Sequence, residues 1–133
     1  MWISLSNSFL SIVQPLSQKT PPEHRNQDVL LVRARREGDI EKTFPDATVI
    51  VGAGTDYLYR AYIDRVLVAK NIMEKVILLD YDNFKNSVED DDLHNAYLNV
   101  WHDMDALQRR DNVNHGYQGT LGAMFEDPEV DRL

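Results

Sequence analysis

Short runs in which hydrophobic and polar residues alternate occupy the first half of the chain and predict β-strands. The N-terminal run WISLSNSFLSIV alternates loosely around Asn7, which predicts an edge strand or a strand split by a turn. The run DVLLVRAR is apolar and β-branched and predicts a second strand. The runs ATVIV and YLYRAYI, joined by GAGTD, predict an antiparallel hairpin, because two glycines can take the positive φ angles of a tight connection.

Two helices are predicted next to these strands. The segment IEKTF predicts a short helix that Asp39 caps and Pro45 ends. Asp64 is expected to cap a longer helix at 65–79, whose opposite side carries lysines and a glutamate. The apolar side of this longer helix, expected to face the core, comprises Val66, Ala69, Ile72, Met73, Val76 and Ile77.

The longest helical pattern lies at 88–109, where apolar residues recur over more than four turns. Four consecutive acids stand at its start: Glu89, Asp90, Asp91 and Asp92. We expect Ser87 to be the N-cap, with Asp90 at the third helical position as in a capping box. Carboxylates in a first turn also meet the positive end of the helix dipole, each stabilising by roughly 0.3–1 kcal/mol. This local role accounts for the acids without any bound ligand.

The element order β-β-α-β-β-α-α predicts an α+β fold. Its architecture would be a two-layer sandwich of an antiparallel sheet of about four strands, a short helix and two longer helices. We predict one domain at 1–110, inside which residues 14–28 form an exposed Pro-rich connection. Residues 111–133 hold three of the six glycines and no sustained period, which predicts an irregular C-terminal tail.

Composition excludes several classes of function. The absence of cysteine excludes disulfides, thiolate metal sites and cysteine nucleophiles. A net charge of -8 argues against direct binding of nucleic acid and favours a basic partner. No signal peptide or membrane-spanning run is visible, which predicts a cytoplasmic protein without a membrane partner.

A local basic patch is nevertheless predicted on the sheet. The segments LVRA and LYRA echo each other, and period-2 alternation places their arginines on the face opposite the apolar side chains. If helices cover the apolar face, an open face would carry Arg33, Arg35, Arg60 and Tyr62. Arginine's planar fork suits phosphate or carboxylate, so this face is a candidate anion or partner site. The alternative is that acids of neighbouring strands or tails pair with these arginines.

Other candidate chemistry is sparse. Neither a metalloprotease helix motif nor a calcium loop is present, and His94 and His102 lie two helical turns apart, so we predict no metal and no cofactor. His102 beside Asp103 resembles a base with an orienting acid, but no nucleophile accompanies it, and we predict no catalytic residues. The connection DYDNFKNS gathers polar side chains that are available for contacts: Asp80, Asp82, Asn83, Lys85 and Asn86.

Three segments, MWISLSNSFLSIV, LLVRARREGDIEKTFPDA and YDNFKNSVEDDDLHNAYLNVWHDM, resemble a group of small uncharacterised bacterial and phage-borne proteins. The resemblance carries over no functional residue. It implies a small accessory protein of a bacterium or its phage. Such proteins, when acidic and without an active-site motif, are expected to inhibit a host defence or metabolic enzyme by occupying a basic nucleic-acid-binding surface.

Three functional hypotheses follow. The first is a non-enzymatic interaction module, such as a phage-type inhibitor of a CRISPR or restriction complex, whose acids Glu89 to Asp92 and Asp103 contact a basic protein surface. The second is a nucleotide- or RNA-binding domain that uses the arginine face. The third is a small enzyme that uses His102 and nearby acids. A homodimer formed through the open sheet face stays an additional possibility.

Overall fold

The structure is a computed structural model that describes residues 1–52 and 55–114. The chain divides into two compact units, Met1–Asp80 and Tyr81–Leu133, which are described separately. The prediction of one domain at 1–110 therefore stays a prediction. Residues 115–133, most of the predicted tail, lie outside the described residues.

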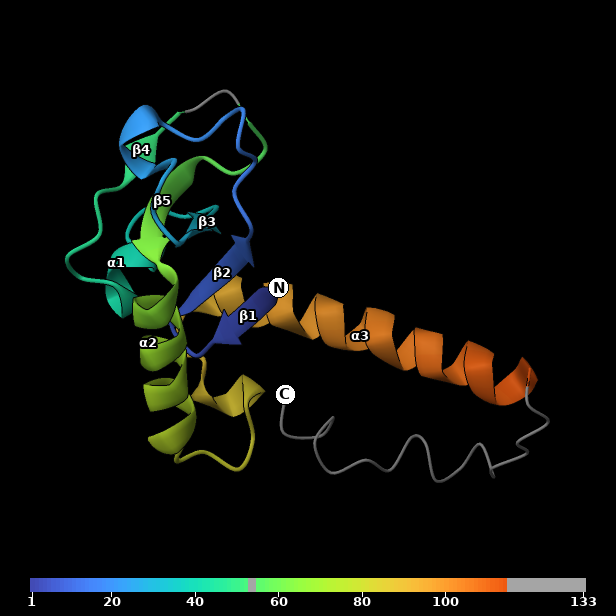
Figure 1. The fold of residues 1–133 in the computed structure, drawn as a ribbon. Coiled ribbons are helices and arrows are strands. Elements are labelled where there is room, and N and C mark those ends of the chain that lie inside the picture. The colour runs from blue at the N-terminus through green and yellow to red at the C-terminus, as the bar shows by residue number, and fades with distance from the viewer. Residues whose placement is uncertain (53–54, 115–133) are drawn as a thin grey trace. The chain divides into compact units, whose positions relative to one another are not determined.

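The first unit contains an antiparallel sheet of five strands in the order β1-β2-β3-β5-β4 (Figure 1). The strands are β1 (Trp2–Leu5), β2 (Ser8–Val13), β3 (Val29–Ala34), β4 (Ile50–Val51) and β5 (Tyr59–Asp64). The predicted α+β class is confirmed, with one strand more than expected. The additional strand arises because the N-terminal run is split by a turn at Asn7, so that β1 and β2 form a hairpin of their own.

The two echoing segments LVRA and LYRA are neighbours in the sheet. Strands β3 and β5 pair so that Val32 lies opposite Ala61 and Arg33 lies opposite Arg60. Since side chains alternate along each strand, Val32 and Ala61 are on one face, and the two arginines share the other face. The prediction that these arginines fall on a common face is confirmed.

The core lies between this apolar face and two helices, α1 (Asp39–Thr43) and α2 (Arg65–Ile77), which gives the predicted two layers (Figure 1). Ile40 and Phe44 from the α1 segment and Val68 from α2 are almost completely buried against the sheet. The buried sheet residues of this cluster are Leu10, Ile12, Val32, Ala34, Ala61 and Ile63. Each large side chain buried here stabilises the unit by roughly 1.5–3 kcal/mol.

The start of α1 differs from the prediction. Gly38, with φ of 84°, occupies the N-cap position, and Asp39 is the first helical residue. A left-handed φ is inexpensive only for glycine, so the backbone conformation favours Gly38 as the cap. The side chain of Asp39 is thereby released from capping and turns into the unit instead.

The cap of α2 was predicted correctly, but the face that it buries was not. Asp64 accepts a hydrogen bond of 3.1 Å from the backbone N–H of Leu67. The predicted core side is largely exposed: Val66, Ala69, Met73, Val76 and Ile77. Val68, which was not predicted, is buried instead, and of the six predicted residues Ile72 packs against the same core. The prediction was wrong because α2 is apolar around much of its circumference, so periodicity alone does not select the side that meets the sheet.

The second unit contains a 3-10 turn, η2 (Lys85–Ser87), and the long helix α3 (Asp91–Asn114). The predicted cap is wrong: Ser87 donates its hydroxyl hydrogen to the Phe84 carbonyl at 2.5 Å, and Asp90 accepts from the Leu93 N–H at 2.8 Å. Residues 111–114 of the predicted tail are helical, because no glycine or proline interrupts the chain before Gly116. An ion pair of 2.8 Å between Asp105 and Arg109 joins two successive turns of α3 ahead of these residues.

Within residues 1–52 and 55–114, no helix has the length and apolar character needed to cross a membrane.

Candidate anion-binding site

Arg33 and Arg60 form the centre of the candidate site. Both side chains are half-buried and leave the sheet on its second face from directly opposite positions. Arg33 donates from Nη2 to the Ser11 hydroxyl at 2.7 Å, and Arg60 donates from Nη2 to the Thr55 hydroxyl. In the part of the chain that the structure describes, neither arginine forms an ion pair with a carboxylate. Both retain their positive charge for another anion.

Tyr57 supports the neighbouring cations without neutralising them. The residue is buried, with 3% exposed, and the guanidinium of Arg33 lies 4.4 Å from the centroid of its ring. The guanidinium of Arg35 lies 4.2 Å from the same centroid and donates to the carbonyl of Asp56 at 3.1 Å. Such cation–π contacts orient the cations. Tyr57 precedes β5, so strand alternation does not determine the side of the sheet on which its ring lies.

An open pocket of about 610 Å³ surrounds the arginine pair. We call it the basic pocket. It is lined by Val13, Gln14, Leu16, Lys19, Pro21, Leu31, Arg33, Ile50, Thr55, Asp56, Arg60 and Tyr62. Three of these side chains are cationic and one, Asp56, is acidic. The pocket therefore combines local positive charge with apolar walls, although the chain as a whole carries a net charge of -8.

The Pro-rich connection forms one wall of the basic pocket. Its short 3-10 turn η1 (Pro22–His24) brings the His24 ring to 5.2 Å from the Tyr62 ring in a stacked arrangement. The Tyr62 hydroxyl donates to the Lys19 carbonyl at 3.4 Å. Leu31 is buried, with 8% exposed. The second face of the sheet is therefore a partly enclosed pocket and not the fully open surface that we expected from the sequence.

Partial burial leaves two nitrogen atoms of the arginine pair without partners. The Nε atoms of Arg33 and Arg60 are buried and make no hydrogen bond within the described ranges. Removing a charged group from water without full compensation is unfavourable. An anion bound between the guanidinium groups would restore part of the lost interaction. Within the described ranges no acid of a neighbouring strand forms an ion pair with Arg33 or Arg60, and the tail acids of the alternative interpretation at 115–133 lie outside the described residues.

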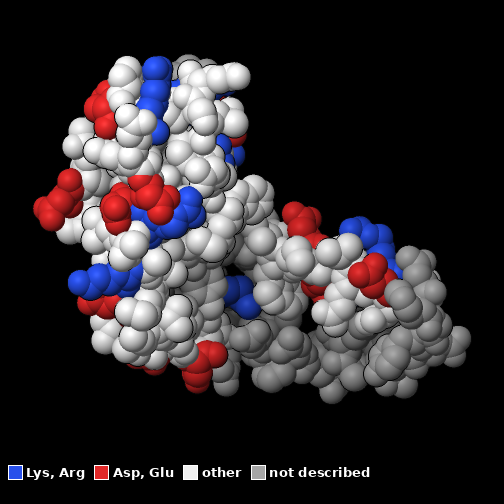
Figure 2. All heavy atoms as spheres, in the orientation of Figure 1, with Lys and Arg blue, Asp and Glu red and all other residues white. Residues whose placement is uncertain are grey.

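The acids at the start of α3 divide into one structural and several exposed groups. Asp90 is the N-cap, whereas Glu89, Asp91, Asp92 and Asp103 are exposed and form no ion pair among the placed residues. Figure 2 shows Lys and Arg side chains interspersed with Asp and Glu over one face of the molecule, so neither sign dominates that view. Glu89, Asp91 and Asp92 thus offer exposed carboxylates at the start of α3, and Asp103 offers one farther along the helix.

The polar connection before α3 is partly structural. Asn83 and Lys85 are almost completely buried, and Asn83 accepts a hydrogen bond of 3.1 Å from the Asn86 N–H. The Lys85 ammonium lies 5.1 Å from the Trp101 ring centroid. The exposed members of the predicted contact set are Asp80, Asp82 and Asn86. Two of the five predicted residues thus fold the connection itself.

His94 and His102 make separate contacts in the described chain. His94 shares a hydrogen bond of 2.9 Å with the Lys85 carbonyl, and His102 is exposed with its ring edge-on to Trp101. No group of three or more His, Asp or Glu residues that could hold a metal ion occurs within residues 1–52 and 55–114.

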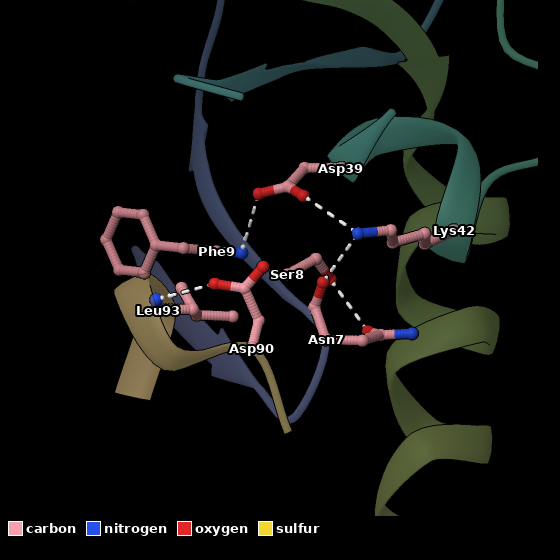
Figure 3. Close-up of polar contacts among 7 residues, drawn as sticks. All are labelled: Asn7, Ser8, Phe9, Asp39, Lys42, Asp90 and Leu93. Atoms are coloured by element: carbon pink, nitrogen blue, oxygen red, sulfur yellow. Dashed lines mark hydrogen bonds and ion pairs between the residues drawn. The ribbon is translucent and has the colours of Figure 1, made fainter. Parts of the chain in front are cut away.

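Sequence reasoning missed a buried polar cluster around Asp39 (Figure 3). One carboxylate oxygen accepts from the Phe9 N–H at 3.1 Å, and the other lies 3.3 Å from the Lys42 ammonium. The same ammonium donates to the Asn7 carbonyl at 2.8 Å. Asp39 therefore ties α1 to the β1–β2 hairpin. The D-x-x-K spacing after Gly38 was the one available signal, because it places Lys42 one turn after Asp39.

Comparison of the chain with protein-family models, with curated proteins and with solved structures finds no match.

Proposed function

We propose that the protein binds a small ligand carrying a phosphate or carboxylate group, in the first instance a nucleotide, in the basic pocket. The observation that carries the proposal is the pair Arg33 and Arg60, which line one pocket from opposite positions and have no carboxylate partner in the described chain. Arginine presents several donors in a plane that fits a phosphate or carboxylate in a bidentate manner.

The surroundings of the pair favour a compact ligand over a long nucleic acid. Among the residues that line the pocket, only Lys19, Arg33 and Arg60 are cationic, while the net charge of the chain is -8. A long polyanion would meet repulsion outside the pocket, whereas a mononucleotide would not. Val13, Leu16 and Leu31 offer apolar walls for the uncharged part of such a ligand.

The test is isothermal titration calorimetry with inorganic phosphate, AMP, ADP and ATP, with adenosine as the uncharged control. We expect saturable binding of the phosphorylated compounds. Arg33→Met and Arg60→Met should each weaken that binding at least tenfold, because each removes one guanidinium from the pair. Arg110→Met is the matched control, since Arg110 is an exposed residue of α3 and does not line the pocket. Binding that is absent, or equal in all variants, would refute the proposal.

A second candidate function is a cytoplasmic interaction module that contacts a basic protein surface. It is favoured by the exposed acids Glu89, Asp91, Asp92 and Asp103, which have no described ion pair. The resemblance to phage-borne proteins suggests a CRISPR or restriction complex as the partner. Affinity purification from a bacterium with intact defence systems should recover a partner with a basic nucleic-acid-binding surface. Replacing the four acids by their amides should abolish recovery, and unchanged recovery would exclude this candidate.

Self-association is a separate proposal. The exposed apolar side chains of α2, which include Val66, Met73, Val76 and Ile77, form a more suitable dimer surface than the second face of the sheet, where Leu31 is buried. Light scattering over a range of protein concentrations would measure it, and Val76→Asp should shift any dimer toward monomer.

A further inference from the structure

A second pocket of the first unit lies at the free edge of β5. Strand β4 pairs only with Tyr59 and Arg60, so the four remaining residues of β5 have no strand beside them on that edge in the described chain. An open pocket of about 690 Å³ occupies this place. We call it the acidic pocket. It is lined by Glu23, His24, Thr43, Phe44, Pro45, Asp46, Ala47, Thr48, Ile50, Tyr62, Ile63, Asp64, Leu67, Asn71 and Glu74.

The charge of this lining is one-sided. Four carboxylate side chains, those of Glu23, Asp46, Asp64 and Glu74, line the pocket, and no lysine or arginine does. The carboxylates come from η1, from the segment after α1, from the end of β5 and from the later half of α2, so no single helix explains their presence together. Only Asp64 has a described structural role, because it caps α2.

A buried hydroxyl in the same lining independently indicates a ligand. Thr43 lines the pocket and is 6% exposed, and its Oγ1 makes no hydrogen bond within residues 1–52 and 55–114. The neighbouring Asn71 side chain donates to the Thr43 carbonyl at 3.3 Å, so its amide makes no hydrogen bond to the Thr43 hydroxyl. A buried hydroxyl without a partner is unfavourable, and a donor that enters from the pocket would relieve that cost.

Much of the remaining lining is apolar, beside the polar groups of His24, Thr48, Tyr62 and Asn71. Phe44 and Ile63 belong to the core of the unit, and Leu67 and Pro45 extend this apolar surface to the mouth of the pocket. An inorganic divalent cation prefers a shell of oxygen ligands at close range, and no such group of three acidic or histidine side chains is present in the described chain. An ammonium or guanidinium group on a carbon chain matches both the carboxylates and the apolar surface.

We propose that the acidic pocket binds an organic cation, namely an ammonium or guanidinium group carried on an apolar stem. This site is independent of the anion site proposed above, although Ile50 and Tyr62 line both pockets. The cation contacts the carboxylates of Asp46 and Glu74 at the mouth, and its stem lies against the apolar side chains. Its N–H group is the donor that the Thr43 hydroxyl lacks.

The test is an NMR titration of the full-length protein with n-butylamine at neutral pH, where the amine is protonated. We expect saturable amide shifts at lining residues of the acidic pocket, and no saturable shifts with 1-butanol, which has a similar shape but no charge. A short peptide with one lysine and blocked termini provides the second arm. Binding of butylamine but not of the peptide identifies a free amine as the ligand, and tighter binding of the peptide identifies a protein side chain.

Matched variants locate the binding. The double variant Asp46→Asn, Glu74→Gln should weaken butylamine binding at least fivefold, and Thr43→Val should weaken it twofold or more. Glu41→Gln, which changes an exposed carboxylate of α1 outside the pocket, should leave it unchanged. Dispersed amide spectra verify that each variant is folded, and this check does not depend on anion binding. A failure of the cation proposal can therefore be distinguished from a failure of the anion proposal. No saturable binding of either cation, or equal binding by the double variant, would overturn the proposal.

Discussion

Two charged sites in the first unit differ in whether the protein itself supplies partners of opposite charge. Asp39 is 2% exposed, and its two carboxylate oxygens are met by the Phe9 N–H and the Lys42 ammonium. Arg33 and Arg60 are also partly withdrawn from water, but no carboxylate in the described chain meets them, and their Nε atoms lack hydrogen bonds. One site is closed by the protein's own groups, and the other is open to an external anion.

This difference indicates that the charge of Asp39 has a structural role, whereas the charges of Arg33 and Arg60 are candidates for ligand binding. A buried ion that has its partners holds elements together, and removing it leaves the partners unpaired. A half-buried cation that has hydrogen bonds to hydroxyl groups but no carboxylate partner retains its attraction for an anionic ligand. Variants at the two sites should therefore differ in which property they change: stability for Asp39, and ligand affinity for the arginines.

The largest effect on stability is expected for Asp39→Ala. This change leaves the Phe9 N–H and the Lys42 ammonium without their buried acceptor, and we expect a loss of about 3 kcal/mol in the free energy of unfolding. Urea denaturation measures it. Glu41→Ala, at an exposed position of the same helix, should change stability by less than about 0.5 kcal/mol. Similar losses in both variants would show that Asp39 is not a structural charge.

A smaller effect is expected for Asp90→Ala. Removing the side chain that accepts the Leu93 N–H takes away the N-cap of α3 and should cost about 1 kcal/mol. Thermal unfolding followed by circular dichroism measures the loss. Asp103→Ala is the control, because Asp103 lies inside α3, where alanine is the better helix former and stability should hold or rise slightly. The interpretation of Asp90 as the cap would be abandoned if Asp103→Ala proved the more damaging change.

The smallest effect on stability is expected for Arg33→Met and Arg60→Met measured without ligand. Methionine keeps much of the apolar volume and removes a cation whose Nε is unsatisfied, so each change should alter stability by less than about 1 kcal/mol in either direction. Urea denaturation gives this value, and the titrations with phosphate compounds give the change in affinity. A loss near that of Asp39→Ala would assign the arginines to the structure and remove the contrast between the two sites.

Features that depend on neighbouring residues in the chain could be predicted from the sequence. The Asp64 cap requires only the Leu67 N–H three residues later, and the shared face of Arg33 and Arg60 requires only period-2 alternation in two strands that pair. The prediction of the α3 cap was wrong although the two candidates are equally local, because Ser87 and Asp90 are both residue types that suit an N-cap. Only the η2 turn, in which the Ser87 hydroxyl donates to the Phe84 carbonyl, leaves Asp90 as the cap.

Features that depend on distant residues could not be predicted. The Tyr57 ring contacts the guanidinium groups of Arg33 and Arg35, which belong to a distant part of the chain. One wall of the basic pocket comes from the connection at 14–28, whose prolines predicted only an exposed segment. Asp39 meets Phe9 across 30 residues. No periodicity reports contacts at such separations, because they follow from packing between elements.

The sequence by itself determined the α+β class, the antiparallel hairpin of β4 and β5, the shared face of Arg33 and Arg60, and the acidic composition, since each follows from local periodicity, turn chemistry or residue counts. Only the tertiary structure decided which side of α2 is buried, which charges have partners, and where the two pockets of opposite charge lie. The physical reason is that burial and pairing are properties of the packed unit: a side chain acquires its neighbours only when distant segments come together.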